Sequence, residues 1–441
     1  MFTKKDIVKL IIPLIIEQVL IMTIGMADTI MVAGVGEEAV SAVSIVDSIN
    51  ILLINVFTAL STGGAVVAAQ FLGRRDTKNA SVAAKQLLFV SAAFSITIMT
   101  ICILGNSFIL HTLFGNMDER IMQDSMVYFK ISALSYPALA LYNSGAAIFR
   151  SMGNSKVSMV NSLIMNIVNI SANYTFIYIL DMGVAGAALG SLIARTVSAI
   201  CVLTLLKLSK GDIQIKKLFK LDINTLVIKN ILSIGIPNSI ENSMFQIGKI
   251  LVQGLVVSFG TSAIAANAVS SSIANIAIIP GMAVGLAMIT VVGQCVGAGD
   301  FEQAKKYIKM LTLISTLSMA TINIIIAFSS PFIIAVYKLT EATAETTQKI
   351  IIYHSICAIF IWAISFTLPH GLRASNDVKF TMIVATISMW VFRIAFSYVL
   401  DKYMNMGVFG IWVAMTIDWL FRAIVFSIRY FSGKWQKKAF I

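Results

Sequence analysis

Charged residues are scarce in this sequence of 441 residues. They make up 12% of the chain, whereas hydrophobic residues make up 58%. A soluble domain has about 25% charged residues, so roughly half of the usual charge is missing. The composition excludes a soluble enzyme, a disordered chain and a secreted disulfide scaffold. It indicates a helical protein that crosses a membrane many times.

Motifs that carry chemistry are also missing. The four cysteines show no C-x-x-C spacing and the three histidines form no H-x-x-x-H pair, so we predict neither disulfides nor a metal centre. The chain has no G-x-x-x-x-G-K-[ST] phosphate-binding loop and no Ser/His/Asp motif. We therefore expect a protein that is not an enzyme, needs no cofactor and is not driven by ATP.

Long apolar stretches dominate what is present. A helix needs about 20 apolar residues to cross the hydrocarbon core of a bilayer. The sequence predicts twelve such helices, and hence an all-α polytopic membrane protein. They lie at residues 7–33, 41–71, 87–112, 126–150, 157–180, 184–207, 226–258, 263–296, 307–337, 348–373, 380–400 and 407–430.

The net charge of +12 comes from an excess of Lys and Arg. Most of these residues lie in the loops of one side, which is typical of cytoplasmic loops and not of nucleic-acid binding. This predicts a multi-pass protein of the inner (cytoplasmic) cell membrane with both termini in the cytoplasm. The longest linker, 208–225, carries Lys210, Lys216, Lys217 and Lys220 at mid-chain. It divides the chain into an N-terminal lobe, 1–207, and a C-terminal lobe, 226–441.

The two lobes repeat each other. A shift of 224 positions superposes Pro13 on Pro237 and Glu17 on Glu241 without a gap. The same shift also superposes further polar residues: Gln70 on Gln294, Asp76 on Asp300 and Lys85 on Lys309. Because six is an even number, both six-helix halves enter the membrane in the same direction. They are therefore parallel repeats, with a solute site expected between them.

Three segments carry a family resemblance. The first joins Ile12-Pro13, Glu17-Gln18 and 27–32 (Ala-Asp-Thr-Ile-Met-Val). The second is 69–73 (Ala-Gln-Phe-Leu-Gly), echoed at 293–297, and the third is 149–154 (Phe-Arg-Ser-Met-Gly-Asn), echoed at 372–377. In this order the segments resemble the multidrug and toxic compound extrusion (MATE) family. The resemblance implies a V-shaped pair of six-helix bundles that exports organic, often cationic, compounds in exchange for inward H+ or Na+.

Asp28 is the first candidate for the coupling site. A carboxylate in a partly dry site can bind and release a cation, and the resemblance places the coupling Asp of the family at this position. Asn166, Asn169 and Asn173 form an amide stripe on one helix face, which suits either cation ligation or hydrogen bonds between helices. The resemblance adds Ser191 and Asn143 to this network. One branch of the family has a second Asp where this chain has Asn173, so the coupling ion can be either H+ or Na+. A Na+ ion would bind at Asp28, Asn169 and Asn173.

Other intramembrane charges extend the set of candidates. Glu17, Glu241 and Lys249 could line a substrate or cation path, but the two glutamates suit an equally plain structural role. Another branch of the family uses acidic residues where this chain has Phe245 and Phe360. This predicts that the C-terminal lobe lacks that ion site. The remaining charges within spans are Asp47, Arg195, Arg393 and Asp418.

The sequence therefore predicts a secondary active multidrug exporter. We expect its partners to be small-molecule drugs or toxic organic cations and the lipid bilayer, with no nucleic acid, and we expect a monomer. The alternative is a flippase of lipid-linked oligosaccharides or precursors from the same superfamily. That activity favours a strongly cationic cavity, and few basic residues lie within the predicted spans.

Overall fold

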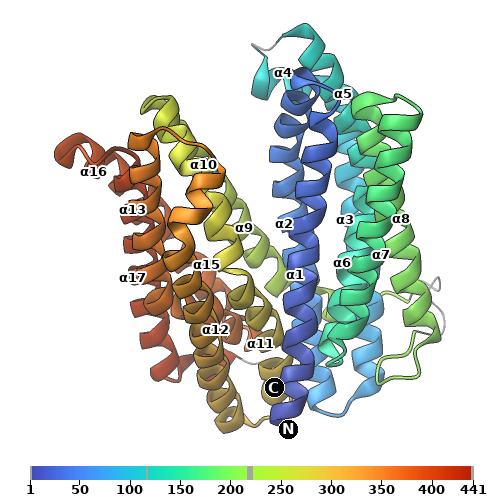
Figure 1. Cartoon of the computed structure of the whole chain (residues 1–441). Coiled ribbons are helices and arrows are strands. Elements are labelled where there is room, and N and C mark those ends of the chain that lie inside the picture. Colours follow the sequence, from blue (N-terminus) through green and yellow to red (C-terminus); the bar gives the residue numbers. More distant parts are fainter. Residues whose placement is uncertain (1, 116–117, 216–221, 439–441) are drawn as a thin grey trace. The chain divides into compact units, whose positions relative to one another are not determined.

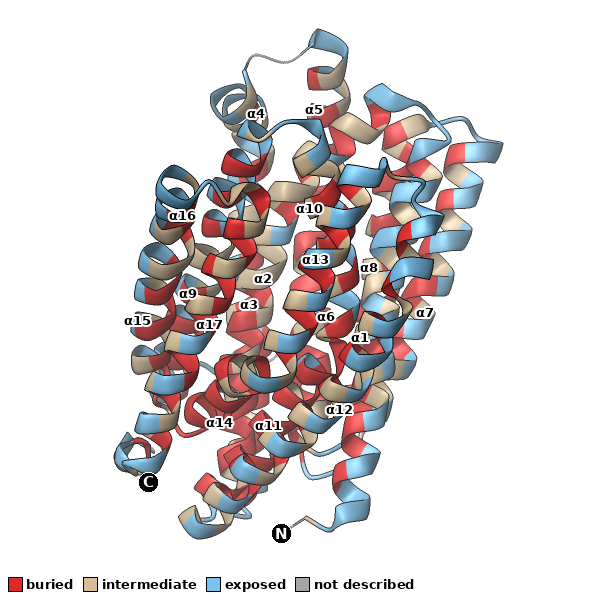
Figure 2. Cartoon of the chain, turned by 60° about the vertical axis from the view of Figure 1, so that its left-hand side comes forward, coloured by how far each residue is buried: buried red, intermediate tan, exposed pale blue. Residues whose placement is uncertain are grey.

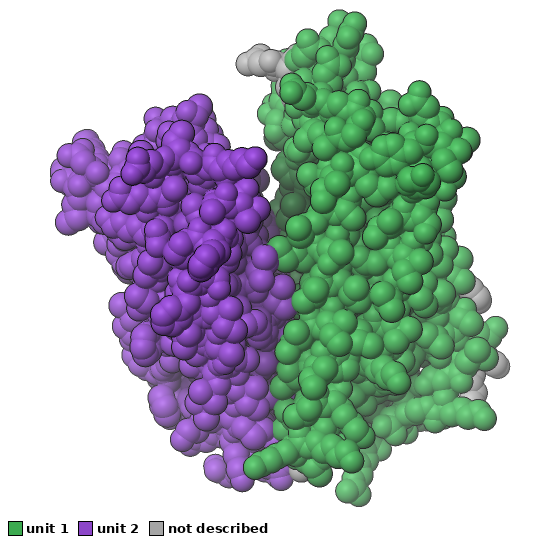
Figure 3. All heavy atoms as spheres, in the orientation of Figure 1, with its two compact units in different colours: residues 1–239 green, residues 240–441 purple. Residues whose placement is uncertain are grey.

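A computed structural model describes residues 2–115, 118–215 and 222–438. Every element within these ranges is a helix (Figure 1). The chain divides into two compact units, one up to Ser239 and one from Ile240 (Figure 3). Each unit is described by itself below.

The N-terminal unit contains eight α-helices, one π-helical segment and the first part of a ninth α-helix within the described residues. They are α1 (Lys4–Ala33), α2 (Glu37–Gly73), α3 (Thr77–Leu104), α4 (Asn106–Phe114), α5 (Glu119–Leu134), α6 (Tyr136–Ser151), α7 (Ser155–Asn173), η1 (Tyr174–Ile179), α8 (Gly183–Leu208) and the start of α9 (Thr225–Ser258).

The C-terminal unit contains the rest of α9 and the helices that follow it. They are α10 (Thr261–Ala277), α11 (Ile279–Gly297), α12 (Phe301–Val336), α13 (Glu341–Cys357), η2 (Ala358–Thr367), α14 (Leu368–Ala374), α15 (Val378–Ser388), η3 (Met389–Ala395), α16 (Phe396–Met404), α17 (Gly407–Phe431) and the short η4 (Lys434–Lys438).

The predicted twelve-helix fold is confirmed. Within the described part of the chain, 10 helices are long and apolar enough to cross a membrane, counting α7–η1, α13–η2–α14 and α15–η3–α16 as continuous helices. The other two spans are α5–α6 and α9. The first is interrupted at Ser135, and the second carries polar residues such as Glu241 and Lys249 along its length.

All six prolines mark helix starts or lie inside long helices. Pro137, Pro280 and Pro369 occupy the first positions of α6, α11 and α14, where a missing N–H leaves no hydrogen bond unmade. Pro13 and Pro237 lie inside α1 and α9, at equivalent places of the repeat. Proline removes an intrahelical hydrogen bond there, which is a common cause of helix kinks.

Matched caps explain part of the sequence repeat. The side chain of Asp76 accepts a hydrogen bond from the backbone N–H of Asn79 (3.0 Å), and Asp300 accepts one from Gln303 (2.9 Å). These are N-caps, which satisfy a free N–H in the first turn of α3 and of α12. Consequently α3 begins at Thr77, well before the predicted start of that span at residue 87.

Each unit has its own apolar core. The core of the N-terminal unit includes Phe57, Phe129 and Tyr136, which are all almost fully buried. The core of the C-terminal unit is richer in tryptophan and includes Trp362, Trp412 and Trp419. Figure 2 shows α11 and α14 as largely buried, in agreement with the small and apolar residues that line them.

The middle of the chain packs on the N-terminal unit. Ile213 and Ile215 are buried, and the backbone carbonyl of Asp222 accepts a hydrogen bond from Gln86 (2.6 Å). Of the predicted linker 208–225, Lys216, Lys217 and Lys220 lie outside the described residues. The predicted lobe boundaries follow the sequence repeat and stay a prediction. The division of the chain into compact units falls within α9, between Ser239 and Ile240.

Candidate ion-coupling site

Asp28 lies in a hydrogen-bond network built by three helices of the N-terminal unit. The amide nitrogen of Asn173, at the end of α7, donates to Oδ1 of Asp28 over 2.5 Å. The hydroxyl of Ser191, on α8, lies 3.5 Å from Oδ2. Asn169 donates to the Ser191 oxygen (3.2 Å), and its own Oδ1 lies 3.5 Å from the Asn173 amide nitrogen. Four of the predicted residues therefore lie in one network.

A glycine makes this arrangement possible. A Cβ atom at Gly190 would collide with the side-chain oxygen of Asn173, so α8 offers the amide a place that only glycine leaves open. That oxygen is buried and has no hydrogen-bond partner among the described residues. The network thus contains oxygen atoms of a carboxylate, two amides and a hydroxyl, which are the ligand types that a hard cation such as Na+ accepts.

Two predicted residues make their hydrogen bonds to partners other than Asp28. Asn166 donates to the backbone carbonyl of Ser162 in its own helix (2.9 Å). Asn143 donates to the hydroxyl of Thr58 over 3.3 Å and thereby joins α6 to α2. Only the Asn143 contact joins two helices, whereas the Asn166 contact stays within α7 and does not match the predicted hydrogen bonds between helices.

A second acidic residue, for which we predicted no role, lies near the network. Asp47, on α2, accepts hydrogen bonds from Asn50 (3.1 Å) and from the Tyr128 hydroxyl (3.5 Å). Arg195, one turn after Ser191, interacts electrostatically with both Asp28 and Asp47. Intramembrane charge marks these two residues in the sequence, but nothing in their spacing shows that they lie near Asp28.

Glu17 and Glu241 lie in equivalent ion pairs. Arg150 lies 2.9 Å from Glu17, and Arg373 lies 2.6 Å from Glu241. Glu17 also accepts a hydrogen bond from Ser158 (2.6 Å). The repeat thus places the same Glu–Arg pair, with a buried glutamate, in both units. This geometry matches the structural alternative for the two glutamates.

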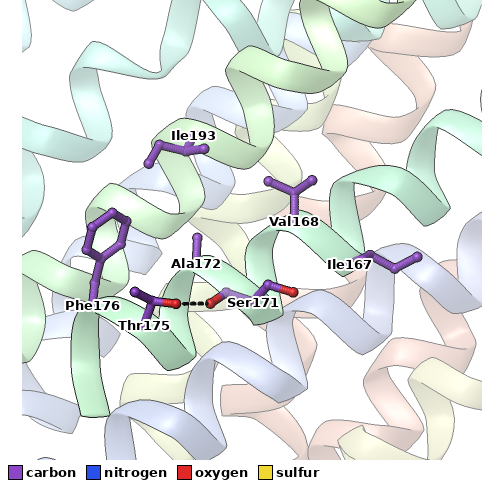
Figure 4. Close-up of a pocket in the computed structure, with 7 residues that line it drawn as sticks. All are labelled: Ile167, Val168, Ser171, Ala172, Thr175, Phe176 and Ile193. Carbon is purple, nitrogen blue, oxygen red and sulfur yellow. Dashed lines mark hydrogen bonds between the residues drawn. The ribbon is translucent and has the colours of Figure 1, made fainter. Parts of the chain in front are cut away.

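One pocket lies beside the network without containing it. Its volume is about 360 Å³, and it is shallow and mostly apolar (Figure 4). The lining residues come from α7, η1 and α8 and are Ile167, Val168, Ser171, Ala172, Thr175, Phe176 and Ile193. None of them is a candidate site residue, and we assign this pocket no part in ion binding.

Comparison with known proteins places this geometry in a family. The MatE family model matches residues 13–175 and again residues 237–399, two copies that begin where the repeat superposes Pro13 on Pro237. The chain is 27% identical over 443 residues to a protein of Thermotoga maritima named "Probable multidrug resistance protein NorM", which covers 99% of this chain and 94% of that protein. It is also 27% identical to "Uncharacterized transporter YisQ" of Bacillus subtilis, over 97% of this chain and 94% of that protein.

Solved structures show the same fold. One is described as the "outward-facing conformation of a multidrug resistance MATE family transporter of the MOP superfamily" and superposes with a TM-score of 0.91 at 20% identity, covering 99% of this chain and 97% of that one. A MOP superfamily transporter from Pyrococcus furiosus superposes with a TM-score of 0.89 at 21% identity, with the same coverage. Two copies of the family model, a twelve-helix fold and full-length relatives agree, and the chain belongs to the MatE family of membrane transporters.

Proposed function

We propose that this protein is a secondary active multidrug exporter, which moves amphipathic organic compounds out of the cell in exchange for H+ or Na+. The names of its relatives support multidrug export, since several are called probable multidrug resistance proteins. We further propose the inner cell membrane as its location, with both termini in the cytoplasm, and a monomer as its working form.

The Asp28 network is the observation that carries the coupling proposal. A carboxylate within a membrane span costs a few kcal/mol, and such residues commonly mark ion pathways. Asp28 is half-buried, and its oxygens face the side chains of Asn173 and Ser191. In this mechanism the cation binds to Asp28 with the neighbouring oxygens of Asn169 and Asn173, and its binding favours the conformation that releases the drug outward.

Charge arithmetic supports the exchange of one monovalent cation. Asp28 and Asp47 carry two negative charges, and Arg195, which interacts with both, carries one positive charge. The cluster therefore has a net charge of −1 when both carboxylates are ionised. One H+ or one Na+ neutralises it, which lowers the electrostatic cost of moving the cluster between a wet and a dry state.

Transport in proteoliposomes tests the proposal. Efflux of a fluorescent amphipathic dye is measured under an imposed Na+ gradient and, separately, under an imposed pH gradient. We expect one gradient to drive efflux, and we expect Asp28→Asn to abolish that efflux while the protein still folds. Glu38→Gln is the matched control, because it removes an exposed carboxylate from the same unit. Cation-driven efflux by a well-folded Asp28→Asn variant would contradict the assignment.

A further inference from the structure

Three basic side chains surround one phenylalanine ring in the C-terminal unit. The ammonium group of Lys249 lies 6.0 Å from the centre of the Phe245 ring, and the guanidinium groups of Arg393 and Arg422 lie 5.2 and 5.8 Å from it. Arg422 also lies 5.3 Å from the centre of the Phe366 ring. The three cations come from α9, η3 and α17, so the fold, and not local sequence, gathers them here.

The cluster has more positive than negative charge. Asp418 is its one acidic neighbour among the described contacts, and it pairs closely with Arg422 (2.8 Å). Ser388 donates a hydrogen bond to the same carboxylate oxygen, Oδ1, and another to the Asp418 backbone carbonyl. Oδ2 lies 3.9 Å from Arg393 and has no hydrogen-bond partner among residues 240–438. Lys249 has no carboxylate partner in the described part of the unit, and Arg393 repels it. The net charge of the four groups is +2.

Donors without acceptors lie in the same region. The Nε of Arg393 is buried and has no hydrogen-bond partner among residues 240–438, and the same holds for the indole nitrogen of Trp419. Trp419 packs edge-on against the Phe366 ring, 5.9 Å between centres. Unpaired donors and unbalanced positive charge are both costly inside a membrane protein, and an anion that accepts hydrogen bonds relieves both costs.

The cluster is open on one side. Arg422 is buried and Arg393 is largely covered, whereas Lys249 is exposed. A lysine in the middle of a membrane span faces a water-filled space far more often than lipid. A ligand can therefore approach from the Lys249 side, and the aromatic rings of Phe245 and Phe366 lie next to the charges.

We propose that this cluster, Lys249 with Arg393 and Arg422 around Phe245, binds the carboxylate or phosphate group of an amphipathic substrate. The inference rests on the proposed exporter function and names its substrate class: an organic zwitterion or anion with an aromatic or apolar body, in place of a purely cationic compound. Aromatic rings accept the apolar body, and the planar guanidinium groups suit a carboxylate or phosphate.

The sequence repeat shows how different the two halves are at this place. The shift that superposes Glu17 on Glu241 places Val252 where the first half has Asp28. The second half therefore has no acidic residue at the position equivalent to Asp28. The basic cluster fills this part of the C-terminal unit instead.

Equilibrium binding to the purified full-length protein in detergent tests the proposal without any gradient. The probes are a rhodamine that carries a free carboxylate and its methyl ester, followed by fluorescence anisotropy. We expect the acid to bind more tightly than the ester. Lys249→Met should weaken binding of the acid about tenfold, the order of magnitude of one lost charge contact, and leave the ester unchanged. Lys249→Arg, which keeps the charge, should retain the preference for the acid.

Lys349→Met provides the matched control. Lys349 is also an exposed lysine of the C-terminal unit above an aromatic ring, 4.5 Å from the centre of Phe409, but it lies outside the cluster. Two competitors of the rhodamine acid, a short-chain phosphatidate and a soluble aromatic carboxylate, are then compared. Stronger displacement by the phosphatidate would assign the anion to a lipid headgroup, and stronger displacement by the carboxylate would assign it to a free compound. Equal affinity for acid and ester, unaltered in Lys249→Met, would overturn the proposal. Failure of gradient-driven transport alone would refute the exporter function and leave this binding result intact.

Discussion

Gly190→Ala is expected to break the Asp28 network through a single added methyl group. The new Cβ would collide with Oδ1 of Asn173 and would lie 3.0 Å from both Cγ and the backbone nitrogen of that residue. Asn173 must then leave its place, and with it the 2.5 Å hydrogen bond to Asp28. Two costs combine: overpacking between α7 and α8, about 1–3 kcal/mol, and loss of a hydrogen bond to a charged group, about 1.5–3 kcal/mol.

Thermal unfolding of the purified protein measures this cost. For a unit of about 200 residues, 1 kcal/mol corresponds to a shift of about 2–4 °C in the unfolding midpoint, so Gly190→Ala should lower the midpoint by about 5 °C or more. Gly25→Ala is the control, because a Cβ at Gly25, in α1 of the same unit, meets nothing within 4 Å. Alanine there should be neutral or slightly stabilising.

A double-mutant cycle separates the clash from a general loss of helix packing. In the background of Asn173→Ala the side-chain oxygen is gone, so Gly190→Ala should cost much less than it does alone. A part of the cost should remain, because the backbone nitrogen of residue 173 stays 3.0 Å away. Strictly additive effects of the two substitutions, or a Gly190→Ala midpoint equal to that of Gly25→Ala, would refute the reasoning.

Three further predictions concern the scaffold. Arg150→Gln should destabilise the N-terminal unit by about 3–5 kcal/mol in chemical denaturation, because it leaves the buried charge of Glu17. Glu17→Gln should cost less, because Arg150 is only partly buried, and the double variant should lose less than the sum. Gly63→Ala should cost about 1–3 kcal/mol, since its Cβ would lie 2.7 Å from a backbone oxygen of α9, whereas Gly254→Ala, with open space, should not. The N–H of Asn79 lowers the pKa of Asp76 below its usual 3.8, so the cap is fully stabilising above that pH and is lost as pH falls through the lowered pKa. Hydrogen exchange in the first turn of α3 should rise in that range, and Asp76→Ala should show the faster exchange already at neutral pH.

Long apolar runs and a repeat of rare polar residues are enough to predict the twelve helices and the two halves, because both signals lie in the local sequence. The contact of Asp28 with Asn169, Asn173 and Ser191 was also predictable, through the amide spacing and the family resemblance. The spacing could not place Asn143, which binds Thr58, since any helix face of α6 could have met α2.

The π-helical segments could not be predicted, although they matter for the sites. η1 begins directly after Asn173, η2 contains Phe366 and η3 contains Arg393. A π turn inserts one residue into a helix and so rotates the side chains that follow it. Its position is decided by packing between helices, which the hydrophobic pattern of a single helix does not record. For this reason the sequence showed Lys249 and Arg393 only as separate charges within spans.

The two halves share their scaffold and differ in the net charge of their clusters of ionisable residues. The Glu–Arg pairs and the Asp caps occur in both halves, whereas the N-terminal cluster carries −1 and the C-terminal cluster +2. If one cation enters as one organic anion leaves, two charges move in the direction that an inside-negative potential favours. A potential of 100 mV then contributes about 4.6 kcal/mol per cycle, against about 2.3 kcal/mol for a zwitterion and none for a monovalent organic cation. Under the proposed one-for-one exchange, the net charge moved in each cycle would make export of an organic anion or zwitterion respond to membrane potential, even where no pH or Na+ gradient exists.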